Sequence, residues 1–436
     1  DFIFYSPNYF CNFAPKIRKI LPVNVKKRIF APSILRAEIK LPASKSISNR
    51  ALVIRALSGG NDPIDNVSDC DDSSVVLEAL CSMPRVIDIK AAGTAMRFMT
   101  SLLATIDGEH IITGTERMRN RPIAVLVDAL RALGADIGYE ERVGYPPLKI
   151  SGRKLKGGRL ALPGNVSSQY ISSLLMIGPT LEQGLTLALE GEIISRPYID
   201  MTLAIMRQYG ARAEWVGEKE IRVEPVPYEP IPYYVESDWS AASYWYEMVA
   251  LSADEKASVV LPGLFEDSLQ GDAAVAKMFE PLGVETVMEQ GRVLIRKSGR
   301  RVETCEWNML AQPDLAQTIV VTCCMKGVHF RISGLQTLRI KETDRIAALQ
   351  KELLKYGFVL TAEGDDVLQW KGEMTDQPVM PEHVSIDTYD DHRMAMGFSL
   401  IGLRSEGIVI NDPMCCRKTF ENYFEVLEET LQALKN

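Results

Sequence analysis

One glycine recurs at a nearly constant interval along this chain, each time after an amphipathic stretch and before a strand-like one. The four positions are Gly134, Gly210, Gly283 and Gly357, which lie 76, 73 and 74 residues apart. Glycine readily adopts the left-handed conformation that ends many helices, which other residues resist. Spacing this regular predicts a chain built by internal duplication.

The repeated unit extends to both sides of these glycines. Its predicted order is helix, strand, helix, Gly, strand, strand, and the hydrophobic period changes from about 3.6 to 2 at each boundary. Three units precede the Pro-rich segment 225–238 and three follow it, which predicts two similar lobes. The first helices of the six units are expected to begin near Ser44, Gly93, Ser167, Ser240, Asp314 and Asp391.

The composition fits a two-domain globular protein. The 436 residues are 46% hydrophobic and 24% charged, and a net charge of −8 argues against general affinity for nucleic acid. No run of about 18 apolar residues predicts a membrane span. The eight cysteines have no CxxC spacing and there are four histidines, so we expect no metal site and a cytoplasmic, reducing location.

Residues 1–30 differ from the rest of the chain. They carry six basic residues but a single acid, Asp1, and they lack the charged-then-apolar order of a signal peptide. We expect them to form a leader or an extension outside the folded core.

Small, polar and basic residues gather where the first helices begin. Each Ser, Gly or Asp there is typical of an ordinary N-cap. Equivalent helices of similar lobes, however, would bring their amide-bearing ends to a common space that favours phosphate and carboxylate groups. Although the protein is acidic overall, arginines and lysines also gather at the predicted connections between a strand and the second helix of a unit, for example in "RMRNRP" and "RIKETDR". We therefore expect a cleft that holds an anionic ligand. An ordinary solvent-exposed surface remains an alternative explanation for any single basic cluster.

Absent motifs narrow the chemistry. The chain has no GxxxxGK[ST] run for a nucleotide P-loop, no dinucleotide fingerprint in "RALSGG" and no G-x-S-x-G context. The remaining prediction is acid–base chemistry by carboxylates and lysines, with arginines holding the substrates.

Six motifs carry a family resemblance: "LPASKSISNRAL", "AGTAMR", "NVSSQYISSLLM", "SRPYIDMT", "KETDRI" and "DDHRMAMGFSL". In this order, from about residue 33 to the C-terminus, the chain resembles the 5-enolpyruvylshikimate-3-phosphate synthase family. The sister transferase that acts on UDP-N-acetylglucosamine usually has a cysteine in the loop before "RP". That loop reads "TGTERMRNRP" here, which favours the synthase.

The resemblance implies an α/β fold of two lobes with six βαβαββ repeats, three per lobe, and helix N-termini facing the interlobe cleft. One lobe would comprise residues 31–41 plus 238–436, and the other residues 42–237. The implied reaction transfers the enolpyruvyl group of phosphoenolpyruvate to the 5-hydroxyl of shikimate 3-phosphate and releases phosphate. The enzyme would act as a monomer without a cofactor.

The resemblance also implies the roles of single residues. Asp314 would accept the 5-hydroxyl proton, while Glu342 and Lys45 are alternatives for the proton at the methylene carbon. Shikimate 3-phosphate would bind to Lys45, Ser46, Arg50, Ser167, Ser168, Gln169, Ser195, Asp314 and Lys341. Phosphoenolpyruvate would bind to Lys45, Gly93, Arg121, Gln169, Arg345, Arg393 and Lys418. No residue is expected to bind a metal.

Two departures from the family bear on the site. Thr337 stands where the family commonly has an Asn that contacts shikimate, and Phe98 stands where it usually has Pro. A catalytically silent paralogue that still binds such anions is the alternative from another class. The full set of predicted catalytic residues argues against it.

Overall fold

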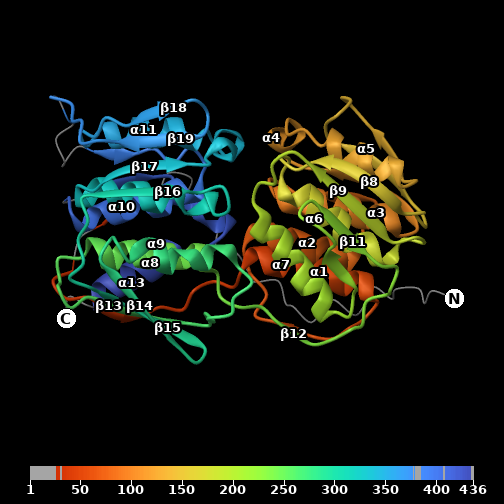
Figure 1. The fold of residues 1–436 in the computed structure, drawn as a ribbon, viewed down its shortest axis with the longest axis horizontal. Helices are drawn as coiled ribbons and strands as arrows, with labels where there is room; N and C mark the ends of the chain where they lie inside the picture. Colours follow the sequence, from red (N-terminus) through yellow and green to blue (C-terminus); the bar gives the residue numbers. More distant parts are fainter. Residues whose placement is uncertain (1–25, 30–31, 377, 379–383, 406–407, 434–436) are drawn as a thin grey trace. The chain divides into compact units, whose positions relative to one another are not determined.

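The computed structural model describes residues 26–29, 32–376, 378, 384–405 and 408–433. They fold into two compact units (Figure 1). The first unit holds Ala43–Val235, and the second holds Glu236–Asn436 with the described part of the chain before Ala43. The chain passes from the first unit to the second inside the Pro-rich segment 225–238.

The first unit contains two four-stranded sheets, β4-β5-β7-β6 and β10-β11-β9-β8, and the strand pair β12-β3. Its helices are α1 (Lys45–Ser58), α2 (Asp71–Ser82), α3 (Gly93–Thr105), α4 (Glu116–Arg119), α5 (Ala124–Ala132), α6 (Ser168–Ile177) and α7 (Arg196–Gln208). Its strands are β3 (Ile64–Asp65), β4 (Val86–Asp88), β5 (Gly108–Thr113), β6 (Asp136–Tyr139), β7 (Leu148–Gly152), β8 (Gly158–Pro163), β9 (Leu185–Glu190), β10 (Ala213–Trp215), β11 (Glu220–Val223) and β12 (Tyr233–Tyr234).

The second unit contains the sheets β14-β15-β13-β2, β16-β17-β19-β18 and β1-β21-β20. Its helices are α8 (Trp239–Leu251), α9 (Val275–Phe279), α10 (Ala316–Lys326), α11 (Arg345–Leu354), α12 (His392–Ser399) and α13 (Tyr423–Ala433). Its strands are β1 (Lys26–Arg28), β2 (Arg36–Glu38), β13 (Ser258–Pro262), β14 (Val284–Glu289), β15 (Arg292–Lys297), β16 (Thr304–Asn308), β17 (His329–Ser333), β18 (Thr361–Glu363), β19 (Val367–Trp370), β20 (Ser385–Ile386) and β21 (Val409–Asn411).

All four-stranded sheets share one topology. In each, the first two strands along the chain are parallel and the last two join them in antiparallel fashion, for example β8 with β9 and then β11 and β10. Four of the six predicted units carry this sheet in full, and smaller sheets represent the other two in the described residues. The α/β fold of repeated βαβαββ units is therefore confirmed. β2 pairs with β13, so the segment before Ala43 supplies the first strand of a sheet in the second unit.

The recurring glycines end the second helix of four units, as predicted. Gly134, Gly210, Gly283 and Gly357 follow α5, α7, α9 and α11, and all have a positive φ between 83° and 103°. A residue with a Cβ atom would be strained in this conformation. The regular interval in the sequence is thus a regular turn in the structure.

The first helices of the repeats form the centre of each unit. In the first unit α1, α3 and α6 pack against one another, and in the second unit α8, α10 and α12 do so. Every residue of α8 except Ser240 is buried, and α3 is buried from Gly93 to Ala104. A helix that is apolar on all sides belongs in such a position, whereas the amphipathic α5, α7 and α11 bury one face.

The prediction that residues 1–30 lie outside the folded core is wrong for residues 26–29. Lys26–Arg28 form β1, which pairs with β21, and Ile29 is 1% exposed within the core of the second unit. The apolar Ile29 and the pairing of β1 along a sheet edge explain why these residues belong to the fold. Residues 1–25 lie outside the described part of the chain.

Candidate active site

The start of α1 brings Lys45 and Ser46 to the end of a central helix of the first unit. Ser44 caps this helix, because its hydroxyl accepts a hydrogen bond from the Ile47 amide at 3.5 Å. The Lys45 ammonium lies 3.3 Å from the carboxylate of Asp72 on α2. A cation at this end of a helix is opposed by the helix dipole, so Lys45 lies where an anion is favoured.

Arg50 lies one turn further along α1 and is 2% exposed. Its guanidinium donates to the Thr202 hydroxyl at 2.7 Å, to the Ser172 hydroxyl at 3.2 Å and to the carbonyl oxygens of Ser46 and Tyr198. It also stacks over the Phe98 ring, 5.3 Å from the centroid. Burial lowers the pKa of Arg50 to about 10, so it stays charged at neutral pH. Its positive charge is thus held by neutral groups.

The start of α3 is crowded by two guanidinium groups. A Cβ atom on Gly93 would lie 2.7 Å from Nη1 of Arg121 and 3.2 Å from Nη1 of Arg97. A side chain at position 93 would therefore displace the Arg121 guanidinium from the start of α3. Gln169 on α6 donates to the Thr94 hydroxyl at 3.2 Å, which joins the starts of α3 and α6. Two like charges beside a helix N-terminus favour an anion there.

The four serines predicted to bind shikimate 3-phosphate have different local roles. The Ser167 hydroxyl caps α6 by accepting from the Gln169 amide at 3.4 Å. Ser195 precedes α7 with a φ of 53°, which is unusual for a residue with a side chain. Among the described residues, the hydroxyls of Ser46, Ser168 and Ser195 make no hydrogen bond. The hydrogen-bonding capacity of these three hydroxyls is thus unused within the described part of the chain.

Arg345 is the centre of the predicted site residues in the second unit. It is 1% exposed, and its Nε donates to Asp391 at 2.8 Å. Its Nη1 donates to Asp314 at 3.0 Å, and its Nη2 donates to Glu342 at 2.8 Å. One guanidinium thus fixes three carboxylates from three different segments.

Three further cations complete this network. Arg393 donates to Asp314 at 2.9 Å, Lys418 donates to Glu342 at 2.6 Å, and Lys341 lies 3.7 Å from Asp314. Burial acts to raise the pKa of Asp314, but Arg393, Lys341 and Arg345 outweigh it and hold this pKa well below its usual range. Lys418 and Arg345 likewise overcome burial and lower the pKa of Glu342. Both carboxyl groups are ionised at neutral pH.

The "KETDR" stretch leads into the start of a helix. Lys341 and Arg345 are not neighbours on this helix, because α11 begins only at Arg345. Asp344 has a structural role, because it caps α11 by accepting a hydrogen bond from the Ala347 amide at 3.1 Å. Lys341 precedes the cap, and the two cations meet because both reach Asp314.

Sequence reasoning gave too small a role to two acids of the second unit. Asp391 caps α12, as expected, but also holds Arg345. Asp272 is 3% exposed and accepts a hydrogen bond from Ser240. Burial raises the pKa of Asp272 to about 7, and nearby Asp314 adds to the rise. The position of Asp391 directly before His392 and Arg393 in the sequence could have indicated its contact with an arginine. The stretch "QGDAA" around Asp272 contains no comparable motif.

The two departures from the family pattern lie in different surroundings. Phe98 is fully buried and contacts Arg50, so it supports a predicted site residue directly. Thr337 lies in the short 3-10 helix Gln336–Ile340, and its buried hydroxyl has no hydrogen-bond partner in the described part of the chain.

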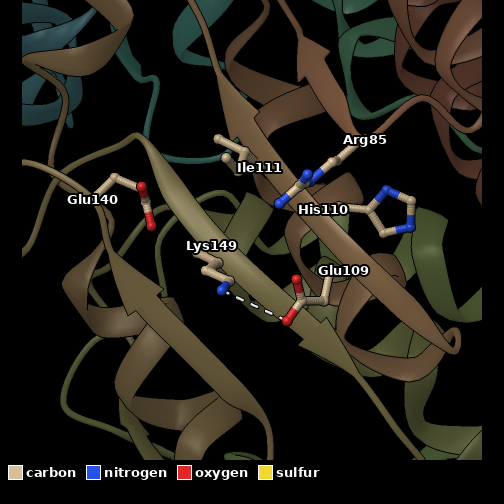
Figure 2. Close-up of a pocket in the computed structure, with 6 residues that line it drawn as sticks. All are labelled: Arg85, Glu109, His110, Ile111, Glu140 and Lys149. Atoms are coloured by element: carbon tan, nitrogen blue, oxygen red, sulfur yellow. Dashed lines mark ion pairs between the residues drawn. The ribbon is translucent and has the colours of Figure 1, made fainter.

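A surface cavity of the first unit is separate from these residues. Figure 2 shows this cavity of about 140 Å³ on the sheet that contains β4, β5 and β7, where Lys149 lies 3.6 Å from Glu109. Its lining contains none of the predicted site residues; it consists of Arg85, Glu109, His110, Ile111, Glu140 and Lys149. The cavity is therefore no part of the candidate site.

The described residues contain neither a metal-binding cluster nor a membrane-spanning helix. No cluster of His, Cys, Asp or Glu side chains in that part of the chain is arranged to hold a metal ion. None of its helices combines the length and the apolar character that crossing a membrane requires.

Known proteins resemble this chain over nearly its whole length. The family model for EPSP synthase (3-phosphoshikimate 1-carboxyvinyltransferase) matches residues 29–85 and 81–427. A 3-phosphoshikimate 1-carboxyvinyltransferase of Bacteroides fragilis strain YCH46 is 52% identical over 399 residues, which cover 92% of this chain and 96% of that protein. One from Photobacterium damsela subsp. piscicida is 37% identical over 425 residues, covering 91% and 97%.

Solved structures agree at the level of the fold. An EPSP synthase from Acinetobacter baumannii superimposes with a TM-score of 0.75 at 21% identity, covering 93% of this chain and 98% of that one. The family resemblance inferred from the six motifs is thereby confirmed. This chain belongs to the EPSP synthase (3-phosphoshikimate 1-carboxyvinyltransferase) family.

Proposed function

We propose that this protein transfers the enolpyruvyl group of phosphoenolpyruvate to the 5-hydroxyl of shikimate 3-phosphate and releases phosphate, as a step of the shikimate pathway to chorismate and the aromatic amino acids. Family membership over residues 29–427 is the observation that carries this function. The charge arrangement within each unit supports it, because both substrates are anions with a phosphate and a carboxylate.

The first unit supplies most of the groups that bind shikimate 3-phosphate. The hydroxyls of Ser46, Ser168 and Ser195 donate to the phosphate oxygens, and Lys45 adds a positive charge. Arg50 is buried, so it attracts the phosphate mainly through its charge rather than through a two-pronged contact. Ser167, Gln169, Lys341 and Asp314 complete the proposed contacts.

Phosphoenolpyruvate binds to cations of both units in this proposal. In the first unit the start of α3 at Gly93, with Arg121 and Gln169, presents amide dipoles and a guanidinium. In the second unit the cations are Arg345, Arg393 and Lys418. Arginine pairs with phosphate and carboxylate through two parallel hydrogen bonds, which orients the substrate as well as binding it.

Asp314 takes the proton of the 5-hydroxyl as its oxygen attacks C2 of phosphoenolpyruvate. As described above, three cations lower the pKa of Asp314, which makes it a weak base. An anionic substrate on Arg345 and Arg393 neutralises part of this charge and strengthens the base when it is needed. Substrate binding therefore prepares the proton acceptor.

The methylene carbon gains a proton in the addition step and loses one when phosphate leaves. Lys45 and Glu342 remain alternatives for this carbon. Lys45 is an ammonium that carries a proton to donate, while Glu342 is ionised by Lys418 and Arg345 and is thus ready to accept one. The same group serves both steps if the proton returns along its path.

The test is phosphate release by the purified protein supplied with both substrates, compared with a Lys45→Met variant. We expect steady release that requires both substrates and falls about 100-fold or more in the variant. No release by the unchanged protein would overturn the proposed activity and favour a silent binding protein. We also propose that the enzyme is a cytoplasmic monomer. Light scattering coupled to gel filtration tests its oligomeric state.

A further inference from the structure

We propose that Asp72 is a positioning residue that fixes the Lys45 ammonium for the reaction. This inference rests on the proposed function, and it adds a residue of α2 to the candidate site. The carrying observation is the ion pair between Lys45 Nζ and Asp72 Oδ2 at 3.3 Å, in which the side chains are only 17% and 5% exposed.

The location of Lys45 explains why it needs such a partner. Lys45 is the first residue of α1, where the positive end of the helix dipole repels an ammonium. The four-carbon side chain also has several accessible rotamers, and confining it to one costs conformational entropy. A nearby carboxylate offsets both effects, since it attracts the charge and limits the side chain to one direction.

Asp72 is itself held in place by the fold. It lies in the first turn of α2, where an acid is favoured by the helix dipole. The segment before α2 is joined to α1, because the Ser68 amide donates to the Ser48 hydroxyl at 2.9 Å. Ser48 lies one turn beyond Ser44, the cap of the same helix. The carboxylate and the ammonium therefore belong to elements locked together at their starts.

The pairing leaves Lys45 able to act on a substrate. An ammonium donates three hydrogen bonds, so one carboxylate orients the group without exhausting it. Asp72 therefore influences turnover through Lys45 and does not touch the reacting atoms.

A double-mutant cycle tests the proposal with Asp72→Asn, Lys45→Met and the combined variant. We expect Asp72→Asn to lower kcat/KM about 10-fold to 100-fold in the unchanged background but less than about twofold in the Lys45→Met background. A residue with a merely structural role would weaken both backgrounds equally. Equal effects would overturn the proposal.

Asp71→Asn is the matched control. Asp71 is the neighbouring acid in the same helical turn and is less buried, so its change should leave kcat/KM within about twofold. If Asp71→Asn lowered kcat/KM as much as Asp72→Asn, the cause would be a general electrostatic effect of the acids on α2 and not the specific pair with Lys45.

Urea unfolding of the same variants separates this proposal from the proposed function. Asp72→Asn should shift the urea midpoint in the unchanged background and have less effect with Lys45→Met, because the ion pair is already lost there. If the unchanged protein releases no phosphate, the proposed function fails while the midpoints still decide whether the two residues are coupled. Additive midpoint shifts would refute the coupling.

Discussion

The two units hold their most buried arginines in opposite ways, although Lys45 of the first unit pairs with Asp72. In the first unit Arg50 is surrounded by hydroxyls, carbonyl oxygens and the Phe98 ring, and Arg97 and Arg121 lie together at Gly93. In the second unit Arg345 contacts three carboxylates, and Arg393 and Lys418 each pair with one of them.

This difference indicates a division of labour. Arg50, which is held by neutral groups, retains its attraction for an anionic ligand, so its surroundings in the first unit are suited to binding. Cations paired with carboxylates regulate the proton affinity of those carboxylates, so the second unit is suited to proton transfer. The four predictions below challenge this contrast in order of decreasing effect.

The largest effect should come from Asp314, the proposed proton acceptor in the second unit. Asp314→Asn removes the base and should lower kcat about 10²-fold to 10⁴-fold. The control Asp344→Asn keeps a good helix cap and should leave kcat within about threefold. Steady-state phosphate release measures both. A kcat of Asp314→Asn within about tenfold of the unchanged protein would place the base elsewhere.

Stability should distinguish the two buried arginines. Arg345→Met leaves three carboxylates without their shared cation and should lower the free energy of unfolding by about 3–5 kcal/mol. Arg50→Met leaves hydroxyls and carbonyls unpaired and should lower it by about 1–3 kcal/mol. Urea unfolding followed by circular dichroism measures the free energy of unfolding of both variants. Equal losses would remove the contrast between the units.

Phe98 should affect binding by the first unit. Phe98→Leu removes the ring that supports the Arg50 charge, an interaction of about 0.5–2 kcal/mol, and should raise KM for shikimate 3-phosphate about 3-fold to 30-fold. Met99→Leu is the control, because Met99 is equally buried on α3 and similar in volume. A rise in KM of the same size in both variants would point to helix packing instead.

The smallest effect concerns Glu247, a fully buried acid of α8 in the second unit. Neither of its carboxyl oxygens has a hydrogen-bond partner in the described residues, and burial raises its pKa well above 4.5. Because the folded state holds the proton more tightly, stability is lost as the pH rises from 4.5 toward the raised pKa.

Glu247→Gln removes this titration. The unchanged protein should lose up to about 1.4 kcal/mol of unfolding free energy per pH unit relative to the variant over that range. Urea unfolding at a series of pH values measures the difference. Parallel curves would show that Glu247 does not titrate in the way its surroundings indicate.

The sequence predicted the repeat well because the repeat depends on local signals. Gly134 and its three counterparts end their helices in the conformation that glycine favours, and Ser44, Ser167 and Asp391 act as caps. Local turn chemistry leaves a mark on a single stretch of residues. The sequence did not predict the strand β1, because its partner strand β21 lies almost 400 residues away along the chain.

The site shows the same limit. Motifs singled out the candidate site residues, but not what each of them contacts. That Arg121 fills the space at Gly93, that Arg50 is buried on Phe98 and that Asp72 faces Lys45 are contacts between separate helices. Such contacts depend on packing, which a single sequence does not encode in any short pattern. The cleft expected between the two lobes stays a prediction.

Calorimetric titration with shikimate 3-phosphate tests the division of labour most directly. Asp314→Asn should bind the ligand within about threefold of the unchanged protein although it turns over poorly, whereas Arg50→Met should bind it at least about tenfold more weakly. The opposite pattern, with binding lost in Asp314→Asn and kept in Arg50→Met, would contradict the account.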